Sequence, residues 1–350
     1  MKYNQTNIFY KVTAFDPIHN LVTCRRKNEN LLIAPNNQFV LDELPIIVRE
    51  IDQIYYLLFG NGKCNLFDKY GNIINNIKYD VNLNIFNCGY LYVYEYDENY
   101  NIKYNLFDVD NNKLVSESFF KYELYCNNRY IIGYKNFNDD ITRLTFDNET
   151  LWNYPLSSLG KLPYKNENDE VDKILGIAHG NLWFYTKAGR LIALDIETGE
   201  VTKKYSYLPE DKKLGYELTP GFGRIFFNEA DENLYALGAD YFHIINTKIK
   251  SIEEQYKHSI SDPKGMGKYA IYSPLLQGDY FTFIAADQNS ARLRFLGLFD
   301  IHKKQLVWEH ELFSTKDDNE LIAPEPLYMS GNKLYVKDFN SNLHIFERQD

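Results

Sequence analysis

The amino-acid sequence predicts an all-β fold built from repeated four-stranded antiparallel sheets, and three observations predict it. Tyr occurs 30 times and Phe 23 times against only 11 prolines, which is typical of strands because flat rings pack well on a pleated surface. No stretch keeps the apolar i, i+3, i+4 spacing of an amphipathic helix over about 12 positions. A strand–turn–strand unit also recurs along the whole chain.

The repeat is clearest at residues 182–201, where a strand, a Lys-Ala-Gly turn, a strand ending at Asp195, a Thr-Gly turn and a third strand follow in order. Weaker copies place an acidic residue or an asparagine in the same position, at Asp16, Asp68, Asp108, Asp147, Asn246, Asp300 and Glu347. Neighbouring positions lie about 47 residues apart on average, the size of one four-stranded propeller blade. The sequence therefore predicts a single β-propeller domain over residues 1–350.

These eight positions are predicted to be structural turn anchors. An Asp or Asn that closes a strand accepts hydrogen bonds from turn amides two or three residues further on. Residues that tolerate a positive φ, such as Gly71 and Gly199, then complete the turn.

The two chain ends are incomplete in complementary ways, which predicts how the propeller closes. Pairing of residues 327–347 with an amino-terminal strand makes one composite blade and removes two exposed strand edges. Six complete intervals plus this composite blade give seven blades. The stretches before Asp16 and before Glu347 both fit a third strand, so one is surplus, and eight blades is the alternative.

The unit from Gly189 to Val201 resembles the blade repeat of PQQ-type (quinoprotein-like) β-propellers, whose architecture is shared by WD-like propellers. In that family a Trp after the turn docks between neighbouring blades, and the resemblance assigns this role to Trp308. Lys203, Ser116 and Pro155 stand at the corresponding positions of other copies. Quinoprotein dehydrogenases carry a signal peptide and bound calcium; the sequence shows a sign of neither, so no cofactor is expected.

Charge and hydropathy restrict the partners and the location. With 38 basic and 48 acidic residues the net charge is −10, which disfavours nucleic acid and favours a basic protein partner. No apolar run has signal-peptide or membrane-spanning length, so we expect a cytoplasmic protein without a membrane partner. The four cysteines lack zinc-ligand spacing, and we expect buried strand residues at Cys24, Cys64, Cys88 and Cys126.

No motif predicts catalytic, cofactor-binding or metal-ligating residues. The seven histidines show no metal-ligand spacing, and no nucleophile signature occurs. Residues 220–224 and 264–268 are rich in glycine but lack the spacing of phosphate-binding loops. The charged run from Lys165 to Lys173 is interpreted as a solvated connection.

Unequal blade lengths locate the long connections, which run from the last strand of one blade to the first strand of the next. The extra residues fall at 155–175, 207–223, 257–273 and 314–325. Long loops on a rigid scaffold commonly bind ligands. They supply the candidate partner-binding residues Tyr164, Tyr216, Phe222, Arg224, Met266, Tyr269 and Tyr272. These side chains either contact a partner or pack the loops onto the blades, and the sequence does not separate the two.

The resulting hypothesis is a monomeric, non-enzymatic binding module that docks another protein through its long loops, such as a scaffold or an immunity or antitoxin-like protein. The alternative is a propeller enzyme, a quinoprotein-like oxidoreductase or a lyase, with a site at the central channel.

Overall fold

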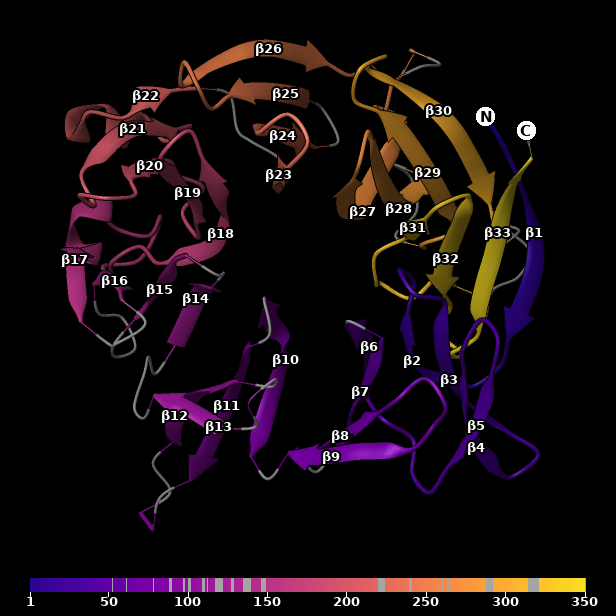
Figure 1. The fold of residues 1–350 in the computed structure, drawn as a ribbon. Coiled ribbons are helices and arrows are strands. Elements are labelled where there is room, and N and C mark those ends of the chain that lie inside the picture. The colour runs from indigo at the N-terminus through magenta and orange to yellow at the C-terminus, as the bar shows by residue number, and fades with distance from the viewer. Residues whose placement is uncertain are drawn as a thin grey trace. The chain divides into compact units, whose positions relative to one another are not determined.

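The computed structural model consists almost entirely of antiparallel strands (Figure 1). It describes residues 1–349 except 52, 61, 78, 88–89, 97, 100–101, 109–110, 112, 117–121, 127–128, 135–139, 146–148, 220–223, 239–240, 260, 263–264, 288–291 and 314–320. The predicted anchor Asp147 and the candidate Phe222 lie outside the described residues. None of the described helices is long and apolar enough to span a membrane.

Contacts divide the chain into two compact units, which are described separately. Unit 1 comprises Met1–Asn76, Phe226–Asn246 and Ile252–Asp350, and unit 2 comprises Ile77–Ile225 and Thr247–Ser251. The prediction of a single domain stays a prediction.

Four sheets belong mainly to unit 1, together with the sheet at Arg224–Lys257, whose first and last strands begin in unit 2. In spatial order the first is β1 (Lys2–Phe9), β33 (Leu343–Gln349), β32 (Lys333–Lys337) and β31 (Tyr328–Ser330). The next two are β2 (Val12–Asp16), β3 (Leu21–Arg26), β4 (Glu29–Ile33) and β5 (Gln38–Leu41), then β6 (Ile47–Ile51), β7 (Ile54–Leu58), β8 (Cys64–Phe67) and β9 (Ile73–Ile77). The others are β23 (Arg224–Asn228), β24 (Asn233–Leu237), β25 (Tyr241–Asn246) and β26 (Ser251–Lys257), then β27 (Tyr269–Gln277), β28 (Tyr280–Asp287), β29 (Phe295–Asp300) and β30 (Gln305–Glu311).

Three sheets belong to unit 2. Two have four strands, β10 (Asp80–Asn87), β11 (Tyr90–Tyr96), β12 (Ile102–Asp108) and β13 (Lys113–Ser116), then β14 (Tyr122–Cys126), β15 (Ile131–Tyr134), β16 (Ile141–Leu144) and β17 (Thr150–Tyr154). The third has five, β18 (Val171–Ala178), β19 (Asn181–Thr186), β20 (Leu191–Asp195), β21 (Val201–Ser206) and β22 (Glu217–Leu218). Two short 3-10 helices lie in its connections, η1 (Leu156–Leu159) and η2 (Pro209–Leu214).

The described strands thus form eight sheets, one more than the seven blades expected first and equal to the alternative. The two counts differ because of Asp16. This residue closes β2, the first strand of its sheet, and does not close a third strand. The third strand there is β4, whose end at Ile33 is followed by Ala34 and carries no acidic anchor. Glu347 lies inside β33 and closes no turn.

The two chain ends pair as the sequence predicts. β1 runs antiparallel to β33, with Lys2 opposite Gln349 and Phe9 opposite Leu343. The N and C labels lie side by side in Figure 1. The amino-terminal strand therefore supplies the outer strand of a composite sheet.

Tryptophans on outer strands pack neighbouring sheets together. Trp308 of β30 contacts Tyr3 of β1 edge to face at a ring-centroid distance of 5.3 Å, which agrees with the docking role expected for it. In unit 2 the indole Nε1 of Trp152 donates to the carbonyl of Ile196 at 2.8 Å. The repeat pattern does not assign that role to Trp152, which stands five residues after its anchor in the sequence and not eight, as Trp308 does.

The described cysteine side chains are buried, as predicted. Cys24 lies in β3 and Cys64 in β8, and burial raises the pKa of the Cys64 thiol to about 12. Cys88 and the side chain of Cys126 lie outside the described residues.

Candidate functional site

A buried ion triad joins the two long connections of sheet β18–β22. Arg190 donates from Nε and Nη2 to the two carboxylate oxygens of Asp211, each at 2.7 Å. Its Nη1 donates to Asp169 Oδ2, also at 2.7 Å. Arg190 is only 1 % exposed and both carboxylates are fully buried. Each end of the guanidinium fork therefore holds a different connection.

Local turns bring the three residues together. Arg190 follows a tight turn in which Gly189, at φ +83°, donates its amide to the carbonyl of Thr186. Asp169 precedes β18, and its Oδ1 accepts from the amide of Ala188 in the same turn at 3.0 Å. Asp211 lies in η2, and its Oδ2 also accepts from the hydroxyl of Ser206 at the end of β21.

Arg190 keeps its charge inside the protein. Burial by itself lowers the pKa of Arg190, but hydrogen bonds to Asp211 and Asp169 outweigh it, and the net pKa is raised. Removing one member of such a group leaves an uncompensated buried charge. The connections are therefore held by charge-assisted bonds that depend on one another. The interpretation of residues 165–173 as fully solvated is wrong for Asp169.

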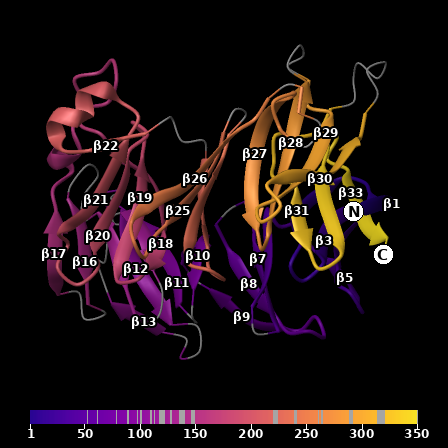
Figure 2. The ribbon, with the colours of Figure 1, turned by 90° about the horizontal axis from the view of Figure 1, so that it is seen from above.

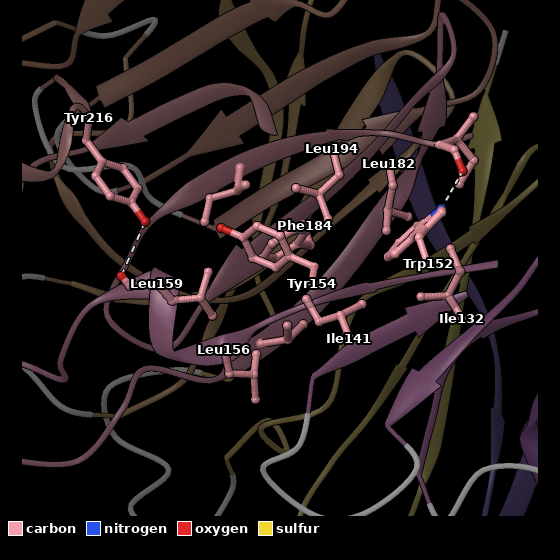
Figure 3. Packing of buried hydrophobic residues seen from close by; sticks show 13 residues of the cluster. Ile132, Ile141, Trp152, Tyr154, Leu156, Leu159, Leu182, Phe184, Leu194 and Tyr216 are labelled. Carbon is pink, nitrogen blue, oxygen red and sulfur yellow. Dashed lines mark hydrogen bonds between the residues drawn. The ribbon is translucent and has the colours of Figure 1, made fainter. Parts of the chain in front are cut away.

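Apolar packing completes the support (Figure 3). Tyr216, which follows η2, is 3 % exposed, and its hydroxyl donates to the carbonyl of Leu159 at 3.2 Å. Leu156 and Leu159 of η1 belong to the same core cluster as Tyr154 and Phe184. Tyr216 thus packs one connection against the other, and is no free contact surface.

Tyr164 is at the tip of the supported connection and is fully exposed. The amide of Lys165 donates to the carbonyl of Leu162 at 3.2 Å, so residues 162–165 form a β-turn. Pro163 occupies its second position and Tyr164 its third, at φ +66°, where Gly or Asn is preferred in a type II turn. A bridge between Lys161 and Asn168 closes the base of the turn.

The other sequence candidates divide between loop core and surface. Met266 and Tyr269 are buried in a cluster of unit 1, and burial raises the pKa of Tyr269. Arg224 and Tyr272 are exposed. Packing of the loops accounts for Tyr216, Met266 and Tyr269, while Tyr164, Arg224 and Tyr272 remain available at the surface.

Five of the described turn anchors make the hydrogen bonds expected of them. Asp195 Oδ1 accepts from the amides of Glu197 and Thr198, each at 2.9 Å. Asp68, Asp108, Asp300 and Asp16 accept comparable bonds from amides two to four residues on. Asn246 instead donates its amide side chain to Glu253.

Among the described residues, no group of three or more His, Cys, Asp or Glu side chains could hold a metal ion. His243 and His344 are buried in β25 and β33, and His258 is buried directly after β26.

No family model and no curated protein matches the chain. Solved structures match it over nearly its full length. The C-terminal WD40 domain of Sif2 is 11 % identical with a TM-score of 0.62, covering 99 % of both chains. Sqt1 from Saccharomyces cerevisiae is 10 % identical (TM-score 0.57, 100 % of both chains), and BamB from Moraxella catarrhalis is 10 % identical (0.55, 99 % of this chain and 100 % of that chain).

These neighbours are β-propellers, and the chain accordingly has a WD-like β-propeller fold of four-stranded antiparallel sheets. At such low identity the likeness shows the fold alone.

Proposed function

We propose that this chain is a non-enzymatic propeller that docks another protein through the long connections of sheet β18–β22, with Tyr164 as the anchor. The observation that carries the proposal is a fully exposed tyrosine at a positive φ, on a turn whose base is tied to a buried ion triad. A side chain other than glycine in this conformation costs free energy, and such residues concentrate at binding and catalytic sites.

Preorganisation explains why this arrangement suits docking. Aromatic anchors dominate interface energies when they enter a pocket of the partner. Ordering a loop on binding costs affinity, and a loop already fixed by Asp169 and Arg190 avoids most of that cost. Tyr carries a large ring with few rotatable bonds, which limits the entropy lost on contact.

The charge of the partner, the type of repeat, the location and the oligomeric state are proposed from the sequence. The net charge of −10 favours a basic protein partner, as in an immunity or antitoxin-like pair, because complementary charge speeds association. We further propose that the repeat is of the PQQ type, on the strength of Gly189–Val201, and that the protein acts as a cytoplasmic monomer.

The test is a binding measurement with matched tyrosine variants. A partner is first identified by cross-linking and co-purification, then purified, and its Kd is measured for the wild type, Tyr164→Ala and Tyr10→Ala. Tyr10 is 65 % exposed in unit 1 and serves as the control. We expect Tyr164→Ala to weaken binding by about 2 kcal/mol, roughly 30-fold, with Tyr10→Ala unchanged.

Equal affinities of the two variants would place the interface elsewhere. Turnover of a substrate by the purified chain, with no partner found, would favour the enzyme alternative.

A further inference from the structure

An open strand edge of sheet β2–β5 and a pocket shared with sheet β6–β9 lie together in unit 1. β5 is the last strand of its sheet, and a pocket of about 420 Å³ adjoins its end. Residues of β5, β8 and β9 and of the adjoining turns line it, namely Val40, Leu41, Phe59, Phe67, Gly71 and Ile73, together with four polar side chains. The volume falls in the range of ligand-binding pockets.

The backbone of β5 presents hydrogen-bonding groups at its outer edge. Ala34 and Asn37 exchange both backbone hydrogen bonds at the turn between β4 and β5. In an antiparallel pair, hydrogen-bonded and non-hydrogen-bonded positions alternate, so the pair of Leu31 and Val40 is non-hydrogen-bonded. The N–H and C=O of Val40 therefore point away from β4, toward the open edge. Val40 is also 69 % exposed.

The protein itself shows how such an edge is covered. In sheet β18–β22 the short strand β22 pairs in parallel with the end of β21, with Ser206 opposite Leu218 (Figure 2). The amide of Thr219 donates to the carbonyl of Ser206 at 2.9 Å. By strand order β5 corresponds to β21, and the described residues provide β5 with no fifth strand.

Charge indicates what kind of segment would fit beside β5. In the covered sheet, Lys203 of β21 forms an ion pair with Glu217 of the added strand. At the open edge the signs are reversed, because two exposed carboxylates, Asp42 and Glu43, follow β5 and line the pocket together with one cation, Lys63. Neither carboxylate forms an ion pair with any described residue. A fifth strand with lysine or arginine would complement them.

We propose that sheet β2–β5 binds an extended basic segment of a protein partner, which adds to β5 as a fifth strand. Its backbone bonds to the outward groups of Val40, one apolar side chain enters the pocket against Phe67 and Ile73, and a basic side chain pairs with Asp42 and Glu43.

The probe is a fluorescein-labelled octapeptide, Thr-Lys-Val-Lys-Ile-Lys-Thr-Val, compared with the same peptide carrying Glu in place of Lys. Fluorescence anisotropy should show saturable binding of the basic peptide to the full chain, and at least about tenfold weaker binding of the acidic one. Equal binding of both peptides, or no binding of either, would overturn the proposal.

Substitutions at Val40 separate backbone pairing from side-chain contact. Val40→Pro removes the outward N–H without breaking a bond to β4, so the sheet is expected to stay folded while the basic peptide binds at least about tenfold more weakly. Val40→Thr keeps the N–H and the branched shape, and should bind within about threefold of the wild type. If the two variants bind equally well, strand addition is wrong.

Charge reversal provides a test that does not depend on proline. The double variant Asp42→Lys/Glu43→Lys should reverse the preference, so that the acidic peptide binds better than the basic one. An unchanged preference would overturn the proposal even if Val40→Pro fails to fold. Tyr164→Ala should leave peptide binding unaltered, which keeps this result distinct from that of the proposed docking through Tyr164. A concentration-dependent dimer lost in Val40→Pro would instead assign the edge to a second copy of the chain.

Discussion

Sheets β18–β22 and β2–β5 have the same antiparallel core of four strands but differ in the connection that leaves the fourth strand. After β21, residues 207–216 fold through η2 and return as β22, which covers the edge. After β5, only residues 42–46 lead to β6, too short a link to fold back onto the sheet. A short connection thus leaves an edge strand open, because only a longer one can return and cover it.

The covered sheet also needs a buried ion triad, whereas the buried charged side chain described in the open sheet is that of Asp16 alone. Its two connections are polar and reach the sheet through Asp169 and Asp211, whose buried charges are compensated by Arg190, which pairs with both. The short link of the open sheet keeps Asp42 and Glu43 at the surface.

Removing Arg190 should weaken the hold on the connection that covers β21, so that this edge becomes more like the open edge of β5. The resulting loss of stability is the largest that we expect. Arg190→Ala leaves two unpaired buried carboxylates and should lower the free energy of unfolding by about 3–5 kcal/mol, measured by urea denaturation. Arg143→Ala is the control, because its partner Glu197 is mostly exposed, and it should cost clearly less. Similar losses for both would show that the triad contributes no more than a pair with one exposed partner.

A substitution at Gly189 tests how closely its turn packs against the long connection of the covered sheet. A Cβ at this position would lie 2.4 Å from the ring of Tyr207, the first residue of the connection, and φ is +83°. Gly189→Ala should therefore cost about 2–3 kcal/mol in chemical denaturation.

Gly180 in the same sheet isolates the backbone part of that cost. Its φ is +73°, but nothing lies within 4 Å of its Cβ position, so Gly180→Ala should cost only about 1 kcal/mol. Equal costs for the two substitutions would mean that Tyr207 moves aside freely.

The sequence contained enough to predict the fold because the repeat is local. Alternating apolar residues and turn anchors such as Asp195 and Asp300 lie within one hairpin, so spacing alone reveals them. The sequence predicts seven blades, whereas the described strands form eight sheets, because the anchor pattern assumes an anchor residue at the end of the third strand of each sheet. In sheet β2–β5 the third strand, β4, ends without an acidic residue, and Asp16 closes the first strand. A third strand that ends without an anchor has no local signal.

The triad, by contrast, could not be predicted. Asp169, Arg190 and Asp211 lie in three different segments of the chain, and no spacing rule links them. Asp169 stands in a mixed-charge run whose other members are largely exposed, so composition favours a solvated loop. Only the folded connections bring the carboxylates to one guanidinium.

The anchor Asp195 should show a smaller effect that depends on pH. Hydrogen bonds, first of all from the amide of Thr198, lower the pKa of Asp195. A carboxyl whose pKa is lower in the folded state stabilises the protein above its unfolded pKa of about 4, and this contribution is lost as the pH falls through the folded pKa. Asp195→Ala should cost about 1–2 kcal/mol at pH 7, less as the pH approaches 3.

Stability curves of the wild type and Asp195→Ala from pH 7 to about pH 3 check this, and they should converge at the acid end. Parallel curves would mean that the carboxylate charge is not what holds the turn.

The smallest expected change in stability has the opposite sign and concerns Tyr164 in the covered sheet. Glycine adopts φ +66° without steric cost, so Tyr164→Gly should leave the free energy of unfolding unchanged or raise it by up to about 1 kcal/mol, although glycine adds entropy to the unfolded chain. The same substitution should abolish the docking contact, because the ring is lost. A residue that lowers stability yet is needed for binding is what a docking anchor on a preorganised turn requires. A clear loss of stability in Tyr164→Gly would show that the ring packs on its own protein, and Tyr164 would then be a structural residue like Tyr216.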